Sequence, residues 1–204
     1  MVQTLNLILL TANELEHLRD ILRRSFQPRA SEDDVQVFTA LFRSWCHNPI
    51  AAFSLCLLAQ SYSVSAALIS KFADIDASVG FLMQIDKLVQ LLESPIFIHM
   101  RLQLLEIQED YHTDLVKSLY GLLMLLPQSA AFRVLRDRLA SVTSMATAIG
   151  RIDLNGDARR LRAPRIDADA LLAHFESVQA KHTELRRKGM YEKSLAKEQN
   201  TANV

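Results

Sequence analysis

Residues 43–71 read RSWCHNPIAAFSLCLLAQSYSVSAALISK, and no charged side chain stands between the first and last residues of this stretch. A helix that spans a bilayer needs about 20 continuous apolar residues. An Asn-Pro pair at 48–49 interrupts the run, and polar residues follow from Gln60 onward. The unbroken part, 50–59, is therefore about half the required length. We predict two adjacent helices, buried on most sides, rather than a membrane span.

Helix start and stop signals recur outward from this stretch. Ser31 is placed to cap a helix whose apolar stripe ends in Trp45, and Asn48-Pro49 has the residue types of a cap and a first helical position. Thr11 to Glu14 has capping-box spacing for an earlier helix. Ser94-Pro95 repeats the Asn-Pro pattern 46 residues later, near the upper end of the HEAT and armadillo period. Further predicted helices span 63–74, 76–93, 95–107, 110–126 and 129–143.

Consecutive helices joined by short turns predict an all-α fold, a HEAT/armadillo-like helical array or α-solenoid with a polar C-terminal tail helix. Only five Gly and five Pro occur among 204 residues, which favours long regular elements over a turn-rich β-protein. Charge density rises after about residue 150. We expect a helical-repeat scaffold domain over 1–143, a linker over 144–166, and a C-terminal helix and tail over 167–204.

The composition excludes some classes of protein and indicates a compartment. The 23 basic residues equal the 23 acidic residues in number, and a net charge of zero argues against a nucleic-acid binder. Two cysteines fit a reducing, intracellular compartment. The N-terminal stretch lacks a basic region and a small-residue cleavage site, so we predict no signal peptide.

A search for catalytic and metal-binding patterns finds none that holds. Cys46-His47 cannot form a dyad between neighbours on a helix, because successive side chains point about 100° apart. Residues 153–157 place oxygen ligands as in a calcium loop, but Ala158 and Pro164 replace the required Gly and Glu. The acids and histidine around 109–114 fit a helix start better than a metal site. We expect no enzyme activity, no cofactor and no metal.

The tail carries an apolar pattern of its own. Five residues with 4-3-4-3 spacing form the seam of a short coiled coil; they are Leu171, Phe175, Val178, His182 and Leu185. The pattern predicts self-association through this seam. It is equally compatible with a helix that packs back onto its own array as a terminal cap, and plain disorder is a third possibility.

Four segments resemble a known family. They are LNLILLTANELEHLRDILR (5–23), LFRSWCHNPIAAFSLCLLAQSY (41–62), QIDKLVQLLESPIFIHMRLQLLE (84–106) and SLYGLLMLLPQSAAFRVLRDRL (118–139). Together they are similar to the C-terminal domain of the ArPIKfyve family of vacuole-morphology scaffolds. The resemblance covers about residues 5–140 and does not extend to the tail.

The resemblance implies a HEAT-type fold and a scaffold without catalysis. Members of that family hold the lipid kinase PIKfyve together with a Sac-domain phosphoinositide 5-phosphatase, and both enzymes act on phosphatidylinositol 3,5-bisphosphate. The family's C-terminal domain is implicated in phosphatase binding and in formation of homo-oligomers. The implied location is cytoplasmic and peripheral on endosomal and vacuolar membranes, with membrane contact only through the partners.

Two other functions stay open from the sequence. One is an α-helical cysteine hydrolase built around Cys46, which rapid labelling of that thiol in folded protein would support. The other is an unrelated α-solenoid adaptor that binds a peptide in its groove. Recovery of the phosphatase or the kinase from a lysate would separate that adaptor from a scaffold of the ArPIKfyve family.

Overall fold

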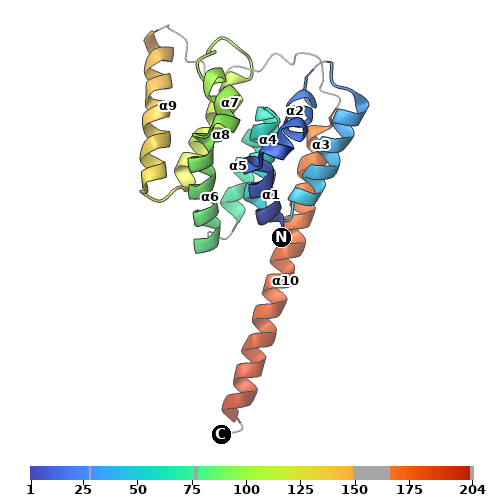
Figure 1. Cartoon of the computed structure of the whole chain (residues 1–204). Coiled ribbons are helices and arrows are strands. Elements are labelled where there is room, and N and C mark those ends of the chain that lie inside the picture. Colours follow the sequence, from blue (N-terminus) through green and yellow to red (C-terminus); the bar gives the residue numbers. More distant parts are fainter. Residues whose placement is uncertain (28, 76–77, 149–165, 203–204) are drawn as a thin grey trace.

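The computed structural model describes residues 1–27, 29–75, 78–148 and 166–202, and within these ranges it contains helices and no strand. Figure 1 shows the helices packed side by side, with the last one extending well beyond the others. The all-α array predicted from the sequence is confirmed. Its α-helices are α1 (Val2–Thr11), α2 (Glu16–Arg24), α3 (Glu32–Trp45), α4 (Pro49–Leu58), α5 (Tyr62–Lys71), α6 (Val79–Leu92), α7 (Ile98–Gln103), α8 (His112–Leu125), α9 (Ala130–Ala148) and α10 (Ala168–Ala202).

The charge-free stretch forms α4 and α5 at the centre of the array. Every residue of α4 from Ile50 to Leu58 is buried. Helices α1, α3, α5 and α6 all contact α4, which explains why no face of it carries a charge. No helix in the described ranges has both the length and the apolarity that a membrane crossing requires. The stretch is the core of a folded domain, as the sequence predicted.

Local capping chemistry fixes the starts of α3 and α4. The Ser31 hydroxyl accepts a hydrogen bond from the Asp34 amide, and the Asp34 carboxylate accepts one from the Ser31 amide, which completes a capping box. Asn48 caps α4 by accepting from the Ala51 amide at 2.9 Å, and Pro49 occupies the first helical position. These predicted caps are confirmed.

The end of α4 breaks a common sequence rule. Gln60 has a φ of 61°, in the left-handed region that usually selects glycine. The Gln60 amide donates to the Leu57 carbonyl, and the Ser61 amide donates to that of Cys56. This pair of bonds is the Schellman motif, which ends α4 and redirects the chain into α5.

Three expectations from the sequence need correction. The Thr11–Glu14 capping box does not form; a 3-10 turn at Asn13–Leu15 precedes α2, and neither helix start has a side-chain cap. Ser94 is followed by Pro95 at a first helical position, as expected, but its buried hydroxyl has no hydrogen-bond partner in the described structure. Helix α9 continues past residue 143 to Ala148, because the chain remains helical there.

The rest of the predicted linker, 149–165, lies outside the described residues, and so does the calcium-loop pattern at 153–157. Ile166, the last residue assigned to that linker, is 4% exposed and belongs to the hydrophobic core. The division into three segments stays a prediction.

Helices α5 and α8 make the closest contact in the array. A Cβ built on Gly121 of α8 would lie 2.7 Å from Cγ1 and 2.9 Å from Cγ2 of Ile69 on α5. These distances are too short for any side chain larger than a hydrogen atom. Glycine at 121 therefore lets the two backbones approach.

Candidate functional site

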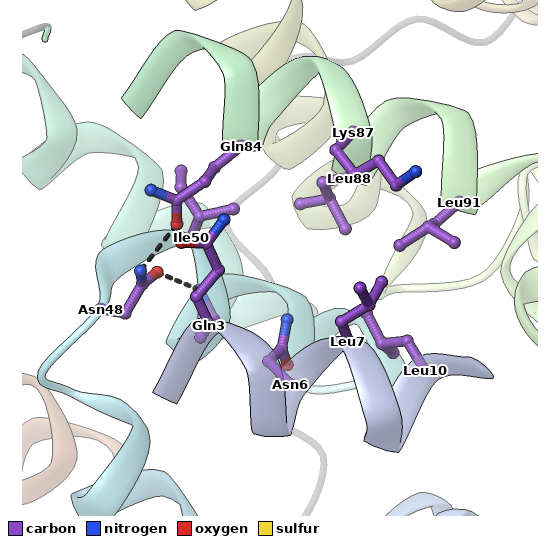
Figure 2. A pocket seen from close by; sticks show the side chains of 11 residues that line it. Gln3, Asn6, Leu7, Leu10, Asn48, Ile50, Gln84, Lys87, Leu88 and Leu91 are labelled. Carbon is purple, nitrogen blue, oxygen red and sulfur yellow. Dashed lines mark hydrogen bonds between the residues drawn. The ribbon is translucent and has the colours of Figure 1, made fainter. Parts of the chain in front are cut away.

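A surface groove runs between α1 and α6 and ends at the start of α4 (Figure 2). Its cavity volume is about 70 Å³. At one end it is apolar, where Leu7 and Leu10 of α1 face Leu88 and Leu91 of α6. At the other end its walls are polar. The groove therefore presents two kinds of chemistry along its length.

A fixed pair of amide side chains builds the polar end. The Asn48 Nδ2 donates to Gln84 Oε1 at 2.7 Å, while Asn48 Oδ1 is occupied in capping α4. Gln84 also donates from Nε2 to the Gly80 carbonyl one turn earlier on its own helix. The cap residue of α4 thus holds α6 in place, and the exposed Gln3 of α1 completes the rim.

Asn6 attaches α1, one wall of the groove, to the core. Its Oδ1 lies 3.0 Å from two donors, Nε1 of Trp45 on α3 and the Ser54 hydroxyl on α4. The buried Arg19 of α2 donates to the carbonyls of Leu9 and Ala12 and so satisfies the end of α1. These long-range bonds position a helix that has no charged residue and no side-chain cap of its own.

Lys87 is the one charged side chain among the residues that line the groove. It is exposed on α6, beside the apolar end (Figure 2). No acidic residue lines the groove, and Lys87 forms no ion pair with any residue of the described ranges. The groove therefore carries an unneutralised positive charge next to an apolar wall.

The predicted coiled-coil seam is split between two environments. Leu171, Phe175 and Val178 are buried at 4%, 1% and 8% exposure, where α10 packs on α3 and α5. The Leu185 side chain is 65% exposed on the part of α10 that extends past the array (Figure 1). The structure thus has the arrangement in which the tail helix caps its own array. Self-association through these residues stays a prediction.

Polar contacts complete the docking of α10. Gln179 Nε2 donates to the Cys46 carbonyl at 2.6 Å, which satisfies a group at the end of α3. His182 Nε2 lies 3.0 Å from His47 Nδ1. Lys71 and Glu176 form an ion pair at 2.7 Å, but both side chains are about half exposed and contribute little.

The structure argues against a thiol nucleophile at Cys46. Its side chain is fully buried, and burial raises the pKa of the thiol to about 12. The pKa of the buried Cys56 is raised too, first by burial and then by Cys46. The neighbouring His47 ring contacts His182 and not a cysteine. Because the thiolate is the reactive form, neither cysteine is placed for catalysis.

Metal binding finds no support in the part of the chain that the structure describes. No group of three or more His, Cys, Asp or Glu side chains there could hold a metal ion. Within the suspected 109–114 region, His112 Nε2 contacts the Leu104 carbonyl at 3.1 Å, a contact that anchors the start of α8.

The sequence did not reveal the groove. Its walls come from three helices far apart in the chain, and no local pattern joins residue 7 to residue 88. One signal was present: α1 and α4 contain no charged residue, whereas Lys87 stands alone on an apolar face of α6.

Comparison with known proteins identifies the domain. A family model for the C-terminal domain of vacuolar protein 14, described by its binding of the Sac-domain phosphatase, matches residues 1–142, from α1 into α9. The "Protein VAC14 homolog" of Schizosaccharomyces pombe is 55% identical over 139 residues, and that of Arabidopsis thaliana is 52% identical over 151 residues. The "Vacuole morphology and inheritance protein 14" of Saccharomyces cerevisiae is 42% identical over 142 residues.

The matches cover 68–74% of this chain and only 15–20% of the length of these relatives. No solved structure matches the chain significantly. The family match covers more than half of the chain and includes all four segments on which the resemblance was based. An unrelated α-solenoid adaptor is therefore excluded, and the chain belongs to the family of phosphatase-binding C-terminal domains of vacuolar protein 14.

Proposed function

We propose that this chain is a non-catalytic scaffold module that binds the Sac-domain phosphoinositide 5-phosphatase. The observation that carries the proposal is the family match over residues 1–142, because that family is described by this binding property. The same residues form the packed array from α1 into α9. The buried thiols and the absence of a metal cluster in the described ranges agree with a binding role.

The wider proposal follows from the family resemblance. The chain contributes to a complex that also contains the kinase PIKfyve and regulates turnover of phosphatidylinositol 3,5-bisphosphate. It works in the cytoplasm and reaches endosomal and vacuolar membranes through its partners. The names of the curated relatives, which refer to the vacuole, support this location.

Self-association belongs to the proposal too. Since Leu171, Phe175 and Val178 are buried against α3 and α5, one route preserves all of their contacts. Two copies would exchange α10, so that the helix of each packs on the array of the other.

The test is direct binding of purified components. The chain, immobilised through its N-terminus, is titrated with purified Sac-domain phosphatase and, separately, with PIKfyve. We expect saturable phosphatase binding that a heat-unfolded sample lacks. Absence of binding at micromolar phosphatase would overturn the proposal. Absence of kinase binding alone would remove only that part.

A further inference from the structure

The size of the α1–α6 groove limits what it can hold. A cavity of about 70 Å³ is well below the roughly 300–1,000 Å³ of small-molecule sites. It has the scale of one side chain. Its apolar end is formed by four leucines, of which Leu7 is 39% exposed, so an incoming apolar group finds a wall that water now covers.

The charge of the groove selects among apolar side chains. Lys87 is exposed at the apolar end and has no acidic partner in the described structure. The nearest described acid on α6, Asp86, is engaged on the other side of the helix, where it accepts from Ser129 of α9 at 2.6 Å and from Gln90. A partner carboxylate would therefore meet an uncompensated ammonium group.

The polar end adds a requirement for hydrogen bonding. Asn48 and Gln84 are held by their mutual bond, which leaves the exposed Gln3 amide to meet backbone groups of an incoming segment. The three features are an apolar wall, a lone cation and an amide rim. They match a peptide segment and not a free anion or a lipid.

We infer that the α1–α6 groove docks a short segment of the Sac-domain phosphatase in which an apolar side chain stands beside a carboxylate. The apolar side chain packs between Leu7 and Leu88, and the carboxylate pairs with Lys87. This inference rests on the proposed function, because the phosphatase supplies the segment. Electrostatic complementarity at such a site sets which segment binds and how strongly binding depends on salt.

Point variants of the full chain test the inference in phosphatase titrations. Lys87→Glu turns attraction into repulsion and should weaken binding about tenfold or more. Lys87→Met keeps most of the aliphatic stem, so it should weaken binding less and reduce its salt dependence. Leu7→Glu should weaken binding comparably to Lys87→Glu. Both positions are exposed, and thermal unfolding checks that the fold persists.

Two matched controls make the result specific. Lys117→Glu makes the same change on an exposed lysine of α8, and Ile8→Glu alters a 45% exposed residue of α1 that does not line the groove. Both controls should bind the phosphatase like the unaltered chain. If Ile8→Glu lost as much affinity as Leu7→Glu, the outer face of α1 and not the groove would be the contact.

An array of overlapping phosphatase peptides, probed with the unaltered chain and with Lys87→Glu, identifies the segment. Peptides that lose binding only with Lys87→Glu should contain Asp or Glu next to Leu, Ile, Met or Phe. Binding of the phosphatase to all groove variants with unchanged affinity would overturn this inference and leave the proposed function standing. A change in the mass of the chain alone in Lys87→Glu would assign the groove to a second copy, which also overturns it.

Discussion

Nδ1 of His47 lies 3.0 Å from Nε2 of His182, although 135 residues separate the two histidines in the sequence. One stands in the turn after α3, and the other stands on α10. Their rings meet edge to face with centroids 5.2 Å apart. A contact of this length requires at least one neutral imidazole, because two imidazolium ions have no acceptor nitrogen to share.

This contact predicts that docking of α10 depends on pH. The pKa of His182 is lowered from its ordinary value of 6.5 by burial, then by His47, then by Arg186. The docked helix therefore binds fewer protons than the detached helix. Docking is complete above about pH 6.5 and weakens as pH falls below that value. Amide hydrogen exchange over residues 168–182 should accelerate between about pH 6.5 and pH 5 beyond the intrinsic pH effect.

Variants of single histidines separate this effect from general acid sensitivity. His182→Gln retains a hydrogen-bonding side chain without a proton to gain, so the extra acceleration should disappear. His17→Ala, at an exposed position on α2, should keep it. The apolar contacts of Phe175 and its neighbours persist at all pH values, so docking should weaken without being abolished. Equal exchange in His182→Gln and the unaltered chain across this pH range would refute the role of the pair.

Gly121 predicts a second measurable effect. Gly121→Ala would force a methyl group against Cγ1 and Cγ2 of Ile69, which are branched close to the backbone and cannot move away easily. We expect a loss of about 1–3 kcal/mol in the free energy of unfolding, despite the better helix propensity of alanine. Urea denaturation measures it.

Gly80 provides the matched control, because a Cβ there would meet nothing closer than the Ser78 hydroxyl at 4.0 Å. Gly80→Ala, near the start of α6, should leave the stability unchanged or raise it slightly. Equal effects of the two substitutions would show that the approach of α5 to α8 is not what requires glycine at 121.

The core position of Trp45 gives a third prediction. Its side chain is 7% exposed, and Nε1 donates to Asn6. Trp45→Ala should cost about 3–5 kcal/mol. Trp45→Phe keeps most of the apolar surface and loses only the bond, for which we expect about 1 kcal/mol. Thermal unfolding ranks the two; an unchanged midpoint for Trp45→Ala together with lost phosphatase binding would instead make Trp45 a contact residue.

Much of the array was predictable because its signals are local. Ser31 and Asn48 cap helices through atoms three residues away, and the charge-free residues of α4 follow from burial on every side. Helix α1 was not predicted, since its placement depends on Asn6 and Arg19 reaching other helices. The left-handed Gln60 was missed because glycine is the usual residue there.

The tail shows a deeper limit of sequence reasoning. An apolar stripe with 4-3 spacing is the same whether it faces a second copy or its own chain. Phe175 contacts Phe72 with ring centroids 6.5 Å apart, and nothing in residues 168–182 specifies that partner. The pattern could identify the residues that need covering. Only the packed structure identifies the surface that covers them here.

Exchange of α10 between copies is the fourth prediction, and sedimentation equilibrium of the full chain tests it. We expect a species of more than one protomer whose fraction rises with concentration, because each exchanged helix keeps its native contacts. Phe175→Ala removes the most buried side chain of the docked stripe and should abolish that species. Leu185→Ala alters a residue that is 65% exposed and should leave it intact.

The pair of variants distinguishes exchange from the coiled coil that the sequence suggested. A coiled coil along the seam would need Leu185 at its interface, so Leu185→Ala would then weaken association about as much as Phe175→Ala. A chain that ends at Ala148 lacks the helix and should be monomeric in either case. If that shorter chain and the full chain contained the same number of protomers, α10 would have no part in self-association, and its role would be to cover α3 and α5 of its own array.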